Sequence, residues 1–145
     1  MTLPLVLDSE GLVALASGRP SERLRALLRE AQERQRDVLV PTLVCAEVCR
    51  TAARTRGVEA ALGRHDPERG QGPPVRLVDT TFDLARSVGA LLGRARAGSG
   101  DIVDAHVVAV AAANGGALVV TSDGEDIVRL AQAVPAARIL TRRAR

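Results

Sequence analysis

The sequence predicts an α/β fold with a central parallel sheet of about five strands. Short apolar runs alternate along the chain with longer segments that have helical periodicity. Strands separated by helices pair in parallel through right-handed crossovers. A length of 145 residues suits one domain with a core of its own, so we expect a single domain over residues 1–145.

The first part of the chain is predicted to contain two strands with two helices between them. The run LPLVL, residues 3–7, is typical of a buried strand. The acidic segment after it opens a short helix through Leu15. Ser21 is a candidate N-cap for the next helix. The apolar positions of that helix are Leu24, Leu27, Leu28 and Ala31. The run DVLVP, residues 37–41, is the second strand.

The middle of the chain is predicted to hold two helices, a loop and one strand. The Pro-Thr pair at 41–42 starts a helix that continues to Ala52. A further helix covers residues 58–62. Residues 65–74 have turn chemistry throughout and are expected to form a loop. The run VRLVD, residues 75–79, is the third strand.

The last part returns to alternating helices and strands. Thr80 or Thr81 is expected to cap a helix, and a second helix covers residues 101–113. The apolar stripe of the first is Leu84, Val88, Leu91 and Leu92. Residues 117–121 form the fourth strand, and a helix from Asp123 to about Ala131 follows. The fifth strand covers residues 137–140, and the final TRRAR is predicted to be a polar tail.

The composition predicts an aliphatic core. Apolar residues make up 46% of the chain and aromatic residues 1%, so Phe82 is expected to be the only ring in the core. The 20 basic residues are all arginine, a compositional bias that weakens arginine content as a functional signal. The net charge of +3 is modest, although a guanidinium fork suits phosphate well.

Nothing in the sequence directs the chain to a membrane. The N-terminus lacks a basic segment and meets an acid at Asp8, so it does not resemble a signal peptide. The longest apolar run is interrupted at residues 114–116, which excludes a membrane span there. Cys45 and Cys49, one helical turn apart, are interpreted as small buried apolar residues rather than zinc ligands. We therefore expect a cytoplasmic protein without membrane partners.

Four acidic residues mark one edge of the predicted sheet. Asp8 and Asp123 follow strands, and Glu47 and Asp104 lie on helices. In a parallel sheet, strand C-termini and the helix N-termini after them gather at one edge, where ligands bind. Carboxylates there would repel one another unless a cation neutralised them, and such oxygen ligands suit Mg²⁺ or Mn²⁺. The pattern predicts metal-dependent chemistry on a phosphate ester.

Some of these acids have a purely structural alternative. Asp8 could serve only as a helix N-cap. Ser122 and Glu125 could form a capping box, which would leave Asp123 to complement the helix dipole. Asp101 also lies in a first helical turn and could be structural. These alternatives remain open at the level of sequence.

Glu47 and Asp104 are harder to explain in structural terms. Each is surrounded by apolar residues, and burying an isolated carboxylate is costly. The two histidines contribute less to the predicted site. His106 follows Asp104 by two positions, so it points away from that helix face and is expected to be packed or to face a partner. His65 lies in the turn-rich loop and is expected to be solvated.

Four short motifs carry a family resemblance. They are LVLDSEGL, the AEV glutamate, GDIVDAHVVAVA and, after a Gly-Gly turn, LVVTSDGEDI. In this order they resemble a PIN-domain ribonuclease, and more narrowly a VapC-type toxin of bacterial toxin–antitoxin pairs. The resemblance runs over about residues 3–140. It implies a three-layer α/β/α sandwich and Mg²⁺- or Mn²⁺-dependent hydrolysis of RNA that leaves a 5′-phosphate and a 3′-hydroxyl.

The resemblance implies a role for each acid. The four catalytic acids of the family fall on Asp8, Glu47, Asp104 and Asp123, which would hold one or two metal ions. Asp126 matches a further acid that many members keep. Asp101 precedes Asp104 by one helical turn, so both can face the same cleft. We expect Asp101 and Asp126 to be auxiliary metal residues.

The resemblance also implies an RNA substrate, a VapB-like antitoxin and a homodimer. Candidate RNA-phosphate contacts, each of which could instead be a solvated surface side chain, are Arg50, Arg54, Arg94 and Arg96. Two alternatives stay open: a PIN-fold nuclease with an RNA-processing or DNA-directed role, and a non-catalytic PIN-fold binding module. The intact set of four acids argues against the binding module.

Overall fold

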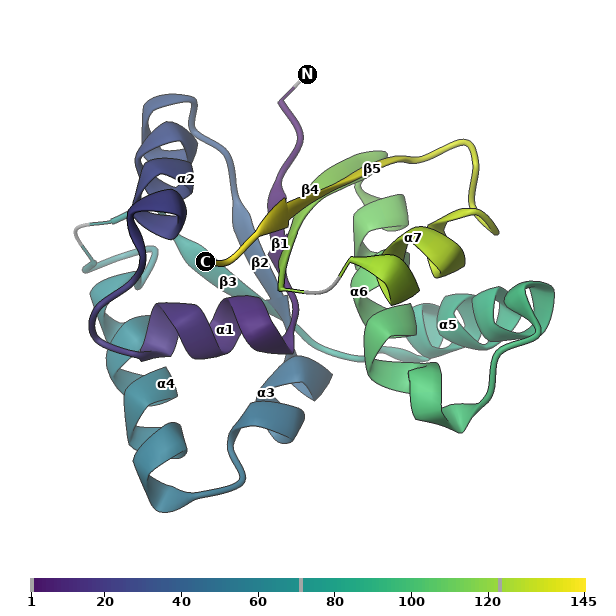
Figure 1. Ribbon diagram of the computed structural model, residues 1–145, viewed down its shortest axis with the longest axis horizontal. Coiled ribbons are helices and arrows are strands. Elements are labelled where there is room, and N and C mark those ends of the chain that lie inside the picture. The colour runs from purple at the N-terminus through teal and green to yellow at the C-terminus, as the bar shows by residue number, and fades with distance from the viewer. Residues whose placement is uncertain (1, 71, 123) are drawn as a thin grey trace.

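The computed structural model describes residues 2–70, 72–122 and 124–145 and is built around one sheet (Figure 1). Its strands lie in the order β3-β2-β1-β4-β5, and every neighbouring pair is parallel. The strands are β1 (Leu5–Leu7), β2 (Val38–Pro41), β3 (Val75–Val78), β4 (Gly116–Thr121) and β5 (Arg138–Arg143). The predicted α/β fold with a parallel sheet of about five strands is confirmed.

Helices cover both faces of this sheet and give the molecule three layers (Figure 1). Helices α1, α2 and α4 lie on one side, α5, α6 and α7 lie on the other, and α3 directly follows β2. Their bounds are α1 (Ser9–Ala16), α2 (Glu22–Glu33), α3 (Thr42–Val48), α4 (Ala52–Arg64), α5 (Phe82–Ala95), α6 (Ile102–Ala113) and α7 (Glu125–Ala131). A short 3-10 helix, η1 (Ser99–Asp101), leads into α6.

The core lies along the three central strands. All residues of β1, β2 and β4 are buried, as expected for parallel strands with helices on both faces. Helix α6 is buried continuously from Ala105 to Ala111 because it packs between the sheet and its neighbouring helices. Gly11 lets α1 approach β4 closely, since an added Cβ would lie 2.6 Å from the Val120 carbonyl oxygen. Helix α1 therefore packs directly against the end of β4.

Phe82 does not lie in the core, and that prediction is wrong. Its side chain is 78% exposed at the first residue of α5. The Arg86 guanidinium lies 5.9 Å from the centre of the ring, one helical turn away. The positions of α5 that reach the core are Val88 and Leu91, which are both buried. The core is aliphatic throughout because the chain has no other Phe, Trp or Tyr.

Several predicted boundaries differ from those observed, including the helix expected over residues 58–62, which is α4 (Ala52–Arg64). The helix expected to reach Ala52 ends at Val48, and α4 begins at Ala52 because Thr51 caps it by accepting a hydrogen bond from the Arg54 backbone N–H at 3.1 Å. The C-terminal segment expected to be a polar tail continues β5 to Arg143, paired along the length of β4.

No helix in the described part of the chain is long and apolar enough to cross a bilayer.

Candidate metal centre

Acidic residues from five elements gather where the central strands end. Asp8 directly follows β1 and Glu47 lies in the last turn of α3. Asp101 ends η1, Asp104 lies in the first turn of α6, and Asp126 lies in the first turn of α7. Asp123, the fourth predicted catalytic acid, lies outside the described residues.

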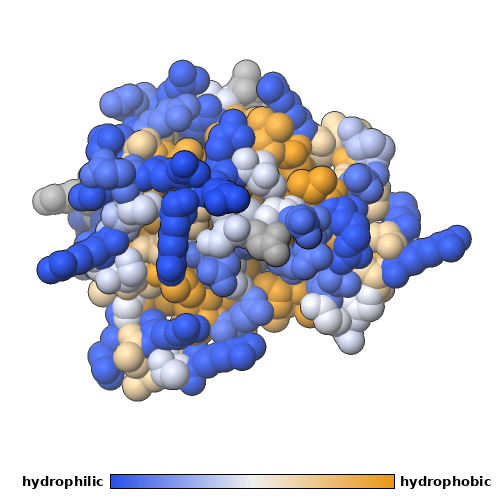
Figure 2. Space-filling view, in the orientation of Figure 1, coloured by the Kyte–Doolittle hydropathy of each residue, from blue (hydrophilic) through white to orange (hydrophobic). Residues whose placement is uncertain are grey.

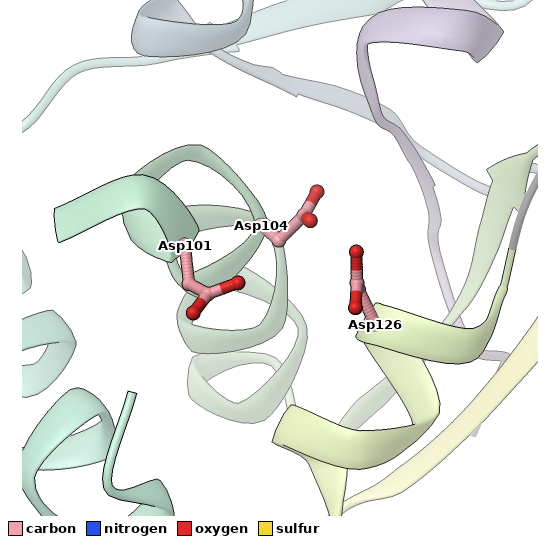
Figure 3. A group of neighbouring side chains, drawn as sticks. All are labelled: Asp101, Asp104 and Asp126. Atoms are coloured by element: carbon pink, nitrogen blue, oxygen red, sulfur yellow. The ribbon is translucent and has the colours of Figure 1, made fainter. Parts of the chain in front are cut away.

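Three aspartates, from η1, α6 and α7, lie close together (Figure 3). One carboxylate oxygen each from Asp101, Asp104 and Asp126 lies within 4.8 Å of the other two. Asp104 and Asp101 are partly buried, whereas Asp126 is exposed. Asp101 and Asp126, which the sequence ranks as auxiliary, are therefore the described acids that make this close group with Asp104.

The charge of Asp104 is strongly disfavoured. Burial, together with the negative charges of the neighbouring carboxylates, raises its pKa to about 6. These neighbours, in decreasing order of effect, are Asp8, Asp126, Glu47 and Asp101. Four acids that are far apart in the sequence therefore all influence the charge of Asp104.

Asp8 is both a helix cap and a member of the acidic group. Its side chain is only 6% exposed, and one carboxylate oxygen accepts a hydrogen bond from the Gly11 backbone N–H at 2.9 Å. The Thr121 side chain at the end of β4 also hydrogen-bonds to it. Burial nevertheless raises the pKa of Asp8 above its usual value. The capping alternative therefore describes a real contact, and it is compatible with a role in the site.

Two polar residues that the sequence did not single out fix the acids in place. The Ser9 hydroxyl donates a hydrogen bond to the Glu47 carboxylate, which joins α1 to α3. Thr121 bonds to Asp8 across neighbouring strands. Ser9 directly follows Asp8 and Thr121 precedes the TSD acid by two positions, which is the only signal that the sequence offered.

In the part of the chain that the structure describes, one arginine forms ion pairs with the acidic group. Arg129 Nη2 is 3.0 Å from Asp101 Oδ1 and 3.5 Å from Asp126 Oδ1. It reaches both because it lies one turn after Asp126 on α7. Five described carboxylates against this one guanidinium leave four negative charges when all are ionised, by simple subtraction. Arg129 was not predicted from the sequence.

This donor set fits a divalent metal ion. All the groups are carboxylates, which are the ligands that Mg²⁺ and Mn²⁺ prefer. Ligand oxygens on opposite sides of one Mg²⁺ lie roughly 4.2 Å apart, twice the metal–oxygen distance. The spacing within 4.8 Å needs only a small side-chain adjustment to reach that value. A cation would also relieve the repulsion that raises the pKa of Asp104.

The remaining predicted residues lie outside this group. The four candidate phosphate contacts are exposed: Arg50 and Arg54 lie around the break between α3 and α4, and Arg94 and Arg96 around the end of α5. Helix α7 begins at Glu125 with Gly124 as its N-cap, two residues later than a capping box at Ser122 predicts.

The histidines take structural positions. His106 is buried, with Nδ1 2.8 Å from the Ile102 carbonyl oxygen, which agrees with the prediction that it is packed. His65 is half-buried rather than solvated, because its ring Nδ1 lies 3.1 Å from the Pro73 carbonyl oxygen where the loop folds back. Burial lowers the pKa of His65.

The fold has close matches among solved structures. VapBC2 from Rickettsia felis, bound to promoter DNA, is 14% identical, with a TM-score of 0.65 over 97% of this chain and 99% of that one. DNA-bound VapBC from Salmonella typhimurium is 19% identical, with a TM-score of 0.62 over 97% and 98%. VapC20 of Mycobacterium tuberculosis, a toxin that cleaves the sarcin-ricin loop, is 20% identical, with a TM-score of 0.55 over 86% and 93%. At these identities the likeness concerns the fold.

Sequence comparison identifies the family. No curated protein matches the chain. The model of the PIN domain family, however, matches residues 5–133, which include all the acids of the group. The protein therefore belongs to the PIN domain family.

Proposed function

We propose that the protein is a metal-dependent endoribonuclease and the toxin of a toxin–antitoxin pair. The observation that carries this proposal is the convergence of acids on Asp104. One carboxylate oxygen each from Asp101, Asp104 and Asp126 lies within 4.8 Å of the other two, and Asp8 and Glu47 also raise the pKa of Asp104. Family membership and the resemblance to VapC-type toxins support it. VapC20, which shares the fold, cleaves RNA of the sarcin-ricin loop.

In the proposed reaction, the acids hold Mg²⁺ or Mn²⁺ and the other side chains hold the acids. Asp104, Asp101 and Asp126 would bind the ion, with Asp8, Glu47 and, from its place in the sequence, Asp123. When bound, the ion lowers the pKa of water and stabilises negative charge on the scissile phosphate.

The neighbouring side chains fix the geometry of these ligands. Ser9 orients Glu47, and Thr121 with the Gly11 N–H orients Asp8. Arg129 offsets part of the negative charge that would otherwise repel RNA. The proposed products are a 5′-phosphate and a 3′-hydroxyl, and we place the activity in the cytoplasm.

The decisive experiment is cleavage of RNA with and without metal. Purified protein should cut total RNA in Mg²⁺ or Mn²⁺, and EDTA should abolish cutting because the carboxylates then have no cation to carry the chemistry. Gel analysis with end-labelled RNA and DNA oligonucleotides of one sequence measures both activity and substrate class. Cleavage of DNA alone would support the DNA-directed alternative, and no cleavage in either metal would support the non-catalytic module.

An antitoxin is the proposed partner. A pocket of about 220 Å³ lies between α1, α3 and α4 and is lined mainly by Val13, Ala16, Val48, Ala53 and Gly57. Hydrophobic residues gather in this region in the space-filling view (Figure 2). An amphipathic antitoxin helix would pack here and extend an arginine to the acidic group in place of metal. Solved structures with this fold include toxin–antitoxin complexes.

Co-expression tests the partner. A small protein encoded beside this gene should co-purify with the chain and inhibit cleavage, and the inhibition should weaken as Mg²⁺ or salt rises. Light scattering of the chain alone tests the proposed homodimer. If no neighbouring product co-purifies and the chain is harmless to a bacterium that expresses it, a general nuclease becomes the better proposal.

A further inference from the structure

A second charged site, distinct from the acidic group, lies between α2 and β5. It is a pocket of about 330 Å³ whose charged lining consists of Arg34, Arg36, Arg138, Arg142 and Glu30. We call it the arginine groove. Glu30 is the only carboxylate among the described lining residues, so four guanidinium groups and one carboxylate leave three positive charges by subtraction. Like charges gathered in this way repel one another unless an anion lies between them.

The arginines of the groove are only partly satisfied by the protein. Arg34 Nε and Arg36 Nη2 each lie 3.5 Å from the same Glu30 oxygen. The Arg36 side chain is only 11% exposed, and its Nε is buried without a hydrogen-bond partner among the described residues. Arg142 Nη1 donates a hydrogen bond to the neighbouring Thr141 carbonyl oxygen at 2.9 Å, and no described carboxylate pairs with this guanidinium. The Arg138 guanidinium has no charged partner in the part of the chain that the structure describes. The groove therefore has unused donors as well as excess charge.

The groove runs along β5, from the amino ends of the parallel strands towards their carboxyl ends. Arg138 and Arg142 are four residues apart on this strand, so they lie on the same face at a separation of roughly 13 Å. Arg142 pairs with Val120, and Val120 pairs with Leu7, the residue before Asp8. Two strand spacings place the Arg142 backbone roughly 10 Å from that of Leu7. One end of the groove thus lies at the sheet edge that carries the acidic group.

We propose that the arginine groove binds the phosphodiester backbone of the RNA substrate beside the cleavage site. This inference rests on the proposed function. The acidic group keeps a negative charge even with one divalent ion, so RNA must be held by cations elsewhere. Guanidinium forks bind phosphate oxygens in pairs. Two arginines separated along a strand match an extended chain of phosphates better than one small anion.

The test measures RNA binding in EDTA, which prevents cleavage. A fluorescein-labelled single-stranded RNA is titrated against the wild type, Arg138→Ala/Arg142→Ala, and the control Arg25→Ala/Arg29→Ala by fluorescence anisotropy over a range of salt. Arg25 and Arg29 lie on the opposite face of α2 from the groove-lining Leu27, Glu30 and Arg34, so the control removes the same charge outside the groove.

The groove variant should bind about tenfold or more weakly at low salt. Its plot of log affinity against log salt should be less steep by about 1.4, because each lost phosphate contact removes about 0.7 for single strands. The control should keep the wild-type slope. Equal slopes for the groove variant and the wild type, or equal losses in both variants, would overturn the proposal. If the double variant does not fold, Arg34→Ala on α2 should still reduce the slope by about 0.7.

Two outcomes of the binding and cleavage assays separate this proposal from the proposed function. RNA binding that depends on the groove without cleavage in Mg²⁺ would retain the groove and reject the nuclease. Metal-dependent cleavage with unchanged RNA binding by the groove variant would retain the nuclease and reject the groove. Competition with poly-glutamate identifies the occupant. If the groove variant loses affinity for that peptide but keeps its affinity for RNA, the groove binds an acidic peptide and the proposal is wrong.

Discussion

Asp104→Asn is expected to lower RNA cleavage by two to three orders of magnitude while the protein stays folded. Asp104 is the carboxylate on which Asp8, Glu47, Asp101 and Asp126 all act, so it is the central proposed ligand of the metal. Loss of one preorganised electrostatic group at a reacting centre typically costs about 10²–10³ in rate. Asparagine keeps the shape of the side chain but binds Mg²⁺ less well. Initial rates on one RNA oligonucleotide in Mg²⁺ measure the effect.

The matched control for this substitution is Asp83→Asn. Asp83 lies on α5, is exposed and pairs with Arg86 one turn away, so it loses the same charge outside the acidic group. The control should keep wild-type activity. In EDTA, Asp104→Asn should also unfold at a higher temperature than the wild type, because it removes one charge from a repelling group. Full activity in Asp104→Asn, or loss of its fold, would contradict the assigned role.

The sequence was sufficient to predict most of the sheet because the strands are short apolar runs between helices. Residues 75–79 and 117–121, for example, differ from β3 and β4 by only one residue at an end. The same pattern placed Asp8 at a strand end. What the sequence could not supply was strand order. The placement of β1 beside β4 brings Asp8 to Thr121, and no local pattern contains that information.

The missed features depend on tertiary contacts or on competing local signals. The bond from Ser9 to Glu47 joins residues 38 positions apart. Arg129 is significant only because α7 packs beside the start of α6. Phe82 appeared suited to the core by its chemistry, but it occupies the first turn of α5, where the helix meets solvent. The polar tail became a strand because β4 offered an unpaired edge.

Stability of the metal-free protein should depend on pH through the same acids. An ordinary aspartate has a pKa of 3.8, whereas Asp104 in the fold has a pKa of about 6. The folded state therefore binds this proton more tightly than the unfolded state does. Its stabilising contribution is complete below about pH 3.8 and is lost as the pH rises through about 6. The pKa of Asp8 is raised in the same direction. His65 acts oppositely, because its lowered pKa destabilises the fold as the pH falls.

Comparison with Asp104→Asn in EDTA removes the His65 effect, since both proteins contain that histidine. The midpoint of thermal unfolding of the wild type should fall relative to the variant between about pH 4 and pH 7.

Added Mg²⁺ should reverse this fall, because the ion binds the ionised carboxylates and stabilises only the folded state. At a concentration of a hundred times its dissociation constant, this stabilisation is about 2.7 kcal/mol. It should be smaller near pH 4, where protons compete with the metal, and smaller in the variant at every pH. Differential scanning fluorimetry of the wild type and of Asp104→Asn, each in EDTA and in Mg²⁺, measures these differences across the pH range. A Mg²⁺ effect of equal size in both proteins and at both ends of the range would show that Asp104 does not belong to a metal site.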